Sequence, residues 1–352
     1  MSPVSMDTYL RVVSPHLAPV LVDEEAWSRL HAVAALLPPC SLAGLELRLR
    51  ENQPKVDFFV RLSYFDPALP PAFLAHPVWR ALQRVCEHVA RPSGRLHGHV
   101  SRLFLEFDLD APPSSVPTPG LFLVLDTSRT VVPSEMLAIA DALGLFKPNA
   151  GMSEATLDRC MAALPPAAKL AHIGFMLSRP GHAVRLVIER MPASAVSQYL
   201  DEVGWRDPAR QLSEVVGDLA GRADAVVMLD LDVADEVCPG VGVEFYVRRE
   251  TDNVPRWRAL LARLVERGFA SPTKVEALLA WPGFTGRRND GESWPPNLEA
   301  GDLAFRGLAR SLFWRNLNHV KLGYRPGREP EAKIYLGFGH NWFPIGTPAD
   351  SE

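Results

Sequence analysis

Five repeats of one local pattern constrain the fold of this 352-residue chain more than any other feature. In each repeat, two runs of strand-like residues are joined by a turn or a proline-rich loop and flanked by stretches with helical periodicity. The paired runs are residues 45–50 with 56–64, 103–109 with 120–126, 171–177 with 183–189, 225–233 with 241–247, and 320–324 with 332–338. Five such hairpins predict ten antiparallel strands, which can close into a barrel and leave no sheet edge exposed.

Apolar residues at helical spacing fill the segments between the hairpins. Asp23 precedes one such segment and has the residue type of an N-cap, while Gly144 and Gly268 end two others as C-terminal caps. Helices are expected over residues 24–37, 78–89, 136–143, 154–164, 194–203, 209–219, 257–264, 273–279 and 302–316. We therefore predict a ring of helices around the barrel.

Alternation within the strands separates an outer face from an inner one. Leu103, Leu105 and Phe107 alternate with Glu106 and Asp108, so the apolar side chains are expected to pack against the helices while the carboxylates point inward. The same alternation points further polar side chains inward: Asp230, Asp232, Glu244, Tyr246 and Arg248. A ten-stranded barrel is wide enough to hold a ligand, so the lumen is predicted to be a solvated cavity.

Charge and composition exclude several classes of partner. The chain has 37 Lys and Arg residues against 41 Asp and Glu, a net charge of −4, which argues against nucleic-acid binding. No apolar run approaches the ~18–20 residues that cross a bilayer, and the first residues lack the features of a signal peptide. The cysteines are far apart and predict buried, reduced thiols: Cys40, Cys86, Cys160 and Cys238. We expect a cytoplasmic monomer or homodimer without a membrane partner.

The repeats run through the whole chain, so a single domain is expected over residues 1–352. Residues 281–300 contain several glycines and a Pro-Pro pair and are the least regular part. This segment is either a lid over one mouth of the barrel or a long irregular loop without a functional role.

The repeat order, over roughly residues 20–342, resembles the aromatic prenyltransferases, whose barrel is built from α-β-β-α units (the ABBA or PT barrel). Glu46, in Leu-Glu-Leu-Arg, stands where the dimethylallyl tryptophan synthase branch of that family carries a glutamate on its first strand. Arg61 precedes an Asp-Pro at residues 66–67, as the second-strand arginine does in that branch. Lys333 and Tyr335 form a Lys-x-Tyr pair, and Arg185 stands at a comparable cationic position.

Three strands depart from the pattern of that family. The fourth strand has no Lys-x-Tyr pair, the sixth has Val187 where a tyrosine would follow Arg185, and the eighth has Glu244 and Tyr246 in place of the pair. Carboxylates therefore occupy inner positions where cations would be expected.

The resemblance implies a prenyl diphosphate co-substrate held by cations and tyrosines inside the barrel. Lys, Arg and Tyr donors suit phosphate oxygens, and the expected binding residues are Arg48, Arg61, Arg185, Tyr246, Lys321, Lys333 and Tyr335. The alternative is a structural role, in which each cation pairs with an inner carboxylate such as Glu46, Asp230 or Glu244.

Two further roles are expected for inner residues. Aromatic faces stabilise a carbocation, and the candidates are Phe59, Tyr246, Tyr335 and Trp342, for each of which ordinary packing is the alternative. Glu46 or Glu106 is the expected general base that takes the acceptor's proton.

The sequence also contains candidate metal ligands. Two Asp-x-Asp strings place pairs of carboxylates on one face of a strand and would hold Mg²⁺ through a diphosphate, although the sequence does not require it; they are Asp108 with Asp110 and Asp230 with Asp232. His172 and His319 also point inward, but without a second ligand at zinc spacing they are expected to be structural, or in the case of His319 to contact diphosphate.

Three functions follow from these observations. The leading prediction is transfer of a prenyl group from an allylic diphosphate to an aromatic acceptor, which is an indole, a phenol or a peptide side chain. The first alternative is a barrel of the same fold that modifies or binds a cationic peptide or small natural product without prenyl transfer. The second is a non-catalytic carrier.

Overall fold

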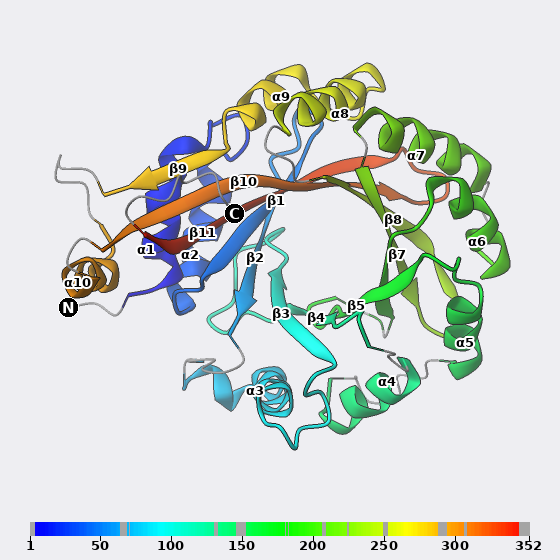
Figure 1. The fold of residues 1–352 in the computed structure, drawn as a ribbon, viewed down its shortest axis with the longest axis horizontal. Coiled ribbons are helices and arrows are strands. Elements are labelled where there is room, and N and C mark those ends of the chain that lie inside the picture. The colour runs from blue at the N-terminus through cyan, green and yellow to red at the C-terminus, as the bar shows by residue number, and fades with distance from the viewer. Residues whose placement is uncertain are drawn as a thin grey trace.

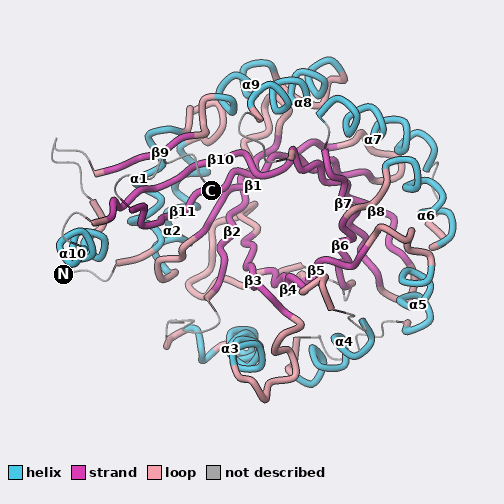
Figure 2. The backbone as a smooth tube through the Cα atoms, in the orientation of Figure 1, coloured by secondary structure: helices cyan, strands magenta, loops and turns pink. Residues whose placement is uncertain are grey.

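The structure is a computed structural model that describes most of the chain. The described residues are 4–63, 69, 71–129, 133–145, 153–179, 181, 183–205, 209–223, 225–248, 253–287, 294–305 and 308–344. As predicted, ten antiparallel strands close into a barrel, and helices surround it (Figures 1 and 2).

The barrel strands follow one another in chain order around the ring. They are β1 (Leu42–Arg48), β2 (Val56–Leu62), β3 (Val100–Phe107), β4 (Gly120–Leu125), β5 (Lys169–Phe175), β6 (Val184–Glu189), β7 (Ala225–Val233), β8 (Val237–Val247), β10 (Ala309–Tyr324) and β11 (Glu331–Pro344). The barrel closes because β11 pairs with both β10 and β1, with Leu45 opposite Leu336 and Glu46 opposite Tyr335. Closure satisfies the backbone groups that an open sheet would leave unpaired at its edges.

Ten helices are described around the barrel. They are α1 (Met6–Val13), α2 (Glu24–Leu36), α3 (Pro77–Ala90), α4 (Pro133–Ala142), α5 (Glu154–Ala162), α6 (Val196–Glu202), α7 (Ala209–Ala223), α8 (Val254–Glu266), α9 (Pro272–Leu279) and α10 (Pro296–Phe305). The predicted N-cap is confirmed, since Ala26 N donates to Asp23 Oδ1 over 2.8 Å. Gly268 follows α8 with φ +71°, a backbone conformation that favours glycine. In the described part of the chain, no helix has both the length and the apolar character needed to span a membrane.

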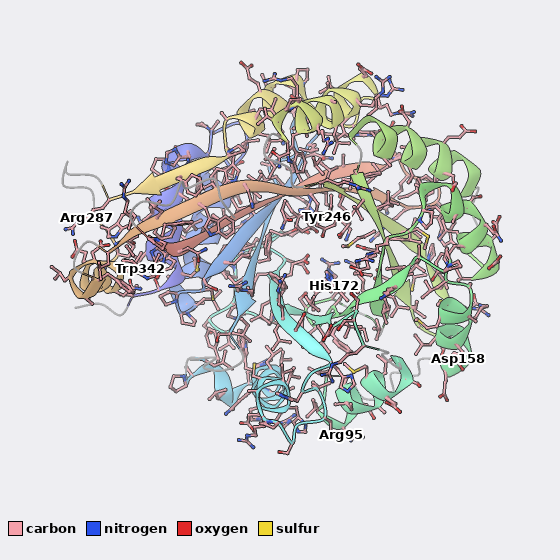
Figure 3. The ribbon with its side chains drawn as sticks, viewed as in Figure 1. Arg95, Asp158, His172, Tyr246, Arg287 and Trp342 are labelled. Carbon is pink, nitrogen blue, oxygen red and sulfur yellow. The ribbon has the colours of Figure 1, made fainter. Side chains whose placement is uncertain are left out.

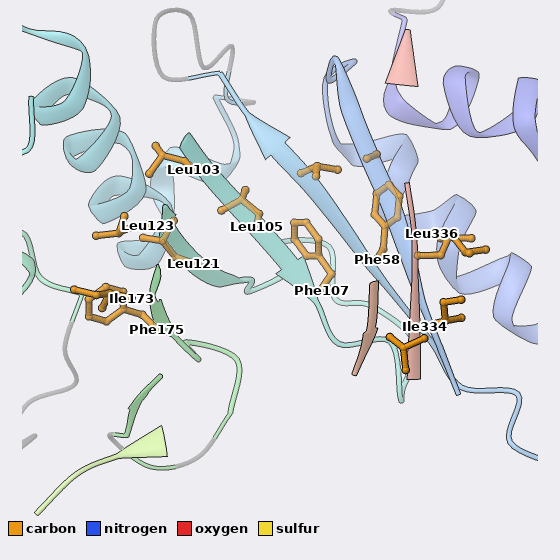
Figure 4. Close-up of a cluster of buried hydrophobic side chains, with 14 of the residues drawn as sticks. Phe58, Leu103, Leu105, Phe107, Leu121, Leu123, Ile173, Phe175, Ile334 and Leu336 are labelled. Carbon is orange, nitrogen blue, oxygen red and sulfur yellow. The ribbon is translucent and has the colours of Figure 1, made fainter. Parts of the chain in front are cut away.

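The apolar core lies between the barrel wall and the helices (Figure 4). Leu103, Leu105 and Phe107 of β3 are at most 2% exposed and belong to this cluster, as the alternation predicted. Ile334 and Leu336 of β11 belong to the same cluster, although they lie about 230 residues further along the chain. Because the apolar face of every strand is used outside the barrel, the polar face is left for the lumen.

The structure corrects one predicted element. The helix expected over residues 302–316 is wrong, because α10 ends at Phe305 and the strand β10 begins at Ala309. On β10, Ser311, Phe313 and Arg315 are buried on one face. This is strand alternation, and it was hidden from the sequence because two of these buried residues are polar.

The irregular segment 281–300 is partly described. It contains the short strand β9 (Gly283–Gly286), which extends the sheet by pairing with β10, and the first half of α10. Residues 288–293 lie outside the described residues. In Figure 1, β9 and α10 lie beside the part of β10 and β11 that extends beyond the ring of strands.

The cysteines form no disulfide in the described chain. Cys40, Cys86 and Cys160 are buried free thiols, as predicted, whereas Cys238 is a free thiol that is partly exposed.

Candidate functional site

The lumen contains a cavity of about 730 Å³ at the end of the barrel where β1 ends and β2 begins. Of the residues that the structure describes, nine basic and eight acidic side chains form its wall. The basic residues are Arg48, Arg50, Lys55, Arg179, Arg185, Lys321, Arg325, Arg328 and Lys333, and the acidic ones are Glu46, Glu106, Asp108, Asp110, Asp230, Asp232, Glu329 and Glu331. Opposite charges therefore almost cancel over a space large enough for a small ligand.

Glu46 is the centre of the first charged cluster. Lys333 Nζ and Arg48 Nη1 each lie 2.8 Å from Glu46 Oε1, and the Tyr335 hydroxyl donates to Oε2. Register explains the cluster, because Tyr335 pairs with Glu46 and Lys333 pairs with Arg48 across β1 and β11. Burial alone would raise the pKa of Glu46, but Lys333 and Arg48 outweigh it and hold the pKa well below its usual range. Glu46 is therefore a firmly ionised anchor and a poor proton acceptor.

Lys321 is the centre of a second cluster, formed with β7 and β8. Its ammonium group binds Asp230 and lies 3.3 Å from Glu244 Oε1, while the Tyr246 hydroxyl donates to Glu244 Oε2 over 2.9 Å. The side chain of Lys321 passes close to the backbone of β8 at Gly242. A Cβ atom added at Gly242 would lie 2.7 Å from Lys321 Cε, so a larger residue there would crowd the lysine. Burial and the charge of Glu244 raise the pKa of Asp230 to about 6, with Lys321 opposing them.

Two arginines bind carboxylates through both ends of the guanidinium fork. Arg185 donates to the two oxygens of Asp232 over 2.7 and 2.9 Å, and Arg179 donates to the two oxygens of Asp108 over 2.9 and 2.5 Å. This bidentate geometry is the strongest form of the pair. Arg179 follows β5, in the turn at the cavity end of the barrel, and was not among the predicted binding residues.

The carboxylates of both Asp-x-Asp strings are occupied by cations. Asp230 binds Lys321, Asp232 binds Arg185, and Asp110 lies 3.0 Å from Lys55 Nζ. In the part of the chain that the structure describes, no three His, Cys, Asp or Glu side chains are grouped as a metal ion would require.

Glu106 lies farther from its cation than Glu46, Asp108, Asp230 and Asp232 do from theirs. Its closest cation is Arg179, with Nη2 3.5 Å from Oε1. Burial and the charge of Glu46 raise the pKa of Glu106 to about 7, although Arg179, Arg185 and Lys321 oppose them. A carboxyl group with this pKa exchanges a proton readily near neutral pH.

Aromatic rings line the lumen beside the charged clusters. The Phe59 ring lies 5.9 Å from that of Tyr335, and the His319 ring stacks between Tyr335 at 4.0 Å and Tyr246 at 4.5 Å. Figure 3 shows Tyr246 and His172 projecting toward the central opening. Trp342 lies outside this opening in the same figure and packs against Phe305 with ring centroids 4.7 Å apart.

Two of the predicted binding residues, Arg61 and Tyr246, lie outside the cavity lining among the described residues. Arg185, Lys333 and Tyr335 line the cavity as expected, whereas Arg61 is absent from its lining among the described residues. Its Nη2 donates to Ser41 Oγ over 2.6 Å, near the opposite end of β1. Residues 64–67, which complete the Arg61 motif, lie outside the described residues.

Comparisons with known proteins give a likeness in structure alone. No family model and no curated protein matches the sequence. The fold resembles the apo crystal structure of the prenyltransferase PriB, with a TM-score of 0.50 and 15% identity over 94% of this chain and 93% of PriB. It also resembles 5-dimethylallyltryptophan synthase from Streptomyces coelicolor, with a TM-score of 0.48 and 13% identity over 94% of this chain and 90% of that one.

Proposed function

Because the barrel has the ABBA fold of the aromatic prenyltransferases, we propose that this chain transfers a prenyl group from an allylic diphosphate to an aromatic acceptor in the lumen. The observation that carries the proposal is the cavity itself, in which cations and aromatic rings from opposed strands line one space of about 730 Å³. Prenyl transfer needs both, since the donor is an anion that leaves behind a carbocation.

The proposed diphosphate site consists of cations that line the cavity. They are Arg48, Arg179, Arg185, Lys321 and Lys333. Each has a carboxylate partner, so a diphosphate would exchange with these carboxylates for the same donors. That exchange is favourable where the carboxylate accepts a proton, and Asp230, the partner of Lys321, has a pKa raised to about 6 that permits it. Arg61 is left out of this proposed site because it lies outside the cavity lining.

The proposed reaction breaks the C1–O bond of the donor, and the diphosphate leaves with the bonding electrons. The ring of Tyr335, which lines the cavity and has the Phe59 ring 5.9 Å behind it, faces the resulting allylic cation. A ring carbon of the acceptor attacks this cation to form the new C–C bond. Restoring aromaticity releases a proton from that carbon. We assign its removal to Glu106, because Glu46 is already neutralised by Lys333 and Arg48.

One observation favours a second function for the same cavity. Within the described part of the chain, eight carboxylates line it, and Asp230 Oδ1 is buried without a hydrogen-bond partner. A cationic peptide or small natural product would satisfy such oxygens without any prenyl transfer. The second proposal is therefore binding or modification of a cationic ligand.

Mass spectrometry separates the two functions. The full chain is incubated with dimethylallyl or geranyl diphosphate and a panel of indoles and phenols, with Mg²⁺ in one series and EDTA in another. Prenyl transfer predicts a mass gain on the acceptor that is lost in Arg185→Gln. A chain that neither alkylates any acceptor nor binds either diphosphate would refute the leading proposal and leave the cationic-ligand function.

A further inference from the structure

His319 is a buried lumen side chain whose two ring nitrogens have no hydrogen-bond partner among the described residues. It lies on β10 opposite Tyr335, and it is 6% exposed. The closest carboxylate atom is Glu244 Oε2, at 3.6 Å from Nε2, which is too far for a hydrogen bond. Buried polar atoms are nearly always hydrogen-bonded, because an unpaired one destabilises the fold. A ligand that pairs with this imidazole would remove that cost.

The orientation of the His319 ring is fixed by its neighbours. The ring stacks between Tyr335, with planes 18° apart, and Tyr246, with planes 27° apart. Both tyrosine hydroxyls donate hydrogen bonds to carboxylates, Tyr335 to Glu46 and Tyr246 to Glu244. Four residues therefore hold the imidazole in place, and none of them satisfies its nitrogens. This is how a preorganised binding group is supported.

Charged and titratable groups surround His319, which burial keeps neutral. They are Lys321 on its own strand, Glu244 and Tyr246 on β8, Asp230 on β7, His172 on β5, Glu46 on β1 and Tyr335 on β11. Burial lowers the pKa of His319 to about 3, and Lys321 adds to this effect while Asp230 and Glu46 oppose it. A neutral imidazole has one N–H donor and one nitrogen that accepts.

Resting on the proposed function, we propose that His319 binds the aromatic acceptor by accepting a hydrogen bond from its indole N–H or phenol O–H group. His319 lies directly behind the cavity lining of the described residues, because its ring stacks on that of the lining residue Tyr335 and the lining residue Lys321 is two positions further along β10. A ligand that extends from the cavity past Tyr335 therefore reaches the imidazole. His319 is then a positioning residue that selects acceptors carrying a hydrogen-bond donor. A site built around such a donor discriminates strongly against an analogue that lacks it.

The test compares indole with benzofuran, which has nearly the same shape but no N–H group. Equilibrium binding of each to the full chain is measured by isothermal titration calorimetry at pH 7.5 and pH 5.5. The wild type is expected to bind indole about five- to tenfold more tightly. The ratio of the indole affinity to the benzofuran affinity is expected to fall to about one in His319→Phe, which keeps a ring in the stack. The same ratio is expected to be unchanged in the matched control His172→Phe. The preference persists at pH 5.5, where an exposed histidine would be protonated.

A ratio near one in the wild type, or a ratio that survives in His319→Phe, overturns the inference. If His319→Phe does not fold, His319→Gln serves instead, since its amide still presents an acceptor and keeps part of the preference. Failure of the proposed function has a different signature, which is an intact preference for indole without any alkylated product. Failure of the inference alone gives alkylated product from the wild type with a ratio that His319→Phe does not change.

Discussion

Replacing Glu46 with glutamine tests whether this carboxylate anchors the cavity wall through its charge. Glu46 is 3% exposed, and Lys333 and Arg48 each place a nitrogen 2.8 Å from it. Glutamine keeps the size of the side chain but removes the buried charge that these two cations share, while Arg48 keeps Asp57, whose Oδ2 lies 2.6 Å from Arg48 Nη1. Removing one member of a buried ion pair costs about 3–5 kcal/mol. We expect the free energy of unfolding at pH 7, measured by urea denaturation, to fall by about that amount.

Glu331 supplies a matched control on the same two cations. Its Oε2 lies 3.6 Å from Lys333 Nζ and 4.0 Å from Arg48 Nε, but the side chain is 40% exposed. Water screens a pair of this kind, so Glu331→Gln is expected to cost no more than about 1 kcal/mol.

The loss in Glu46→Gln depends on pH in a defined direction. Because the pKa of Glu46 is lower in the folded chain than its unfolded value of about 4.3, its ionisation stabilises the fold fully above that value and progressively less as the pH falls toward the folded pKa. The difference between wild type and variant should therefore be constant from pH 7 to about pH 5 and shrink below about pH 4. Equal losses in the two variants, or a difference that grows in acid, would refute the anchoring role.

Three further perturbations address the reaction, the donor site and the core. Glu106→Gln should lower the single-turnover rate of prenyl transfer by roughly 10²–10⁴-fold because it removes the proposed base. The wild-type rate should rise with pH through about 7 as Glu106 loses its proton. Full activity in the variant would exclude this role. Arg185→Gln should weaken binding of inorganic diphosphate at least ~10-fold in calorimetry because it removes a charged bidentate donor, whereas Arg190→Gln, on a side chain that is 65% exposed, should leave it unchanged. Phe58→Ala should cost about 3–5 kcal/mol in urea denaturation because Phe58 is fully buried, and Phe284→Ala should cost clearly less because Phe284 is 42% exposed; similar costs would contradict the assignment of the core.

The closed barrel was predictable because each strand carries its pattern locally. Leucine and valine alternate with carboxylates and arginines over strand-length runs, and this period-two signal sets both the strand and its inner face. The signal failed over residues 309–316, where Ser311 and Arg315 share the buried face with Phe313. Apolar residues such as Phe305, Leu308 and Leu312 also fall at helical spacing there, so the sequence favoured a helix.

The sequence did not predict which carboxylate each cation in the lumen pairs with. The alternation of residues indicates that inner cations and carboxylates share the lumen. The choice of partner, however, depends on the register between strands that are far apart in the chain. Lys333 meets Glu46 across 287 residues, and Arg185 meets Asp232 across 47. The separation of Arg61 from Arg185 has the same origin, because alternation fixes the face of a strand and not the height of a residue along the barrel.

The pairing of β11 with β1 has a consequence for synthesis of the chain. Residues 42–48 emerge from the ribosome early, but their partners at residues 333–339 come almost 300 residues later. Until then β1 has one unpaired edge, and Glu46 lacks Lys333 and Tyr335. Unpaired edges recruit other chains, so the nascent protein depends on keeping β1 shielded until translation reaches the final strand. Premature stop codons before β11 should then yield aggregates in place of a shortened barrel.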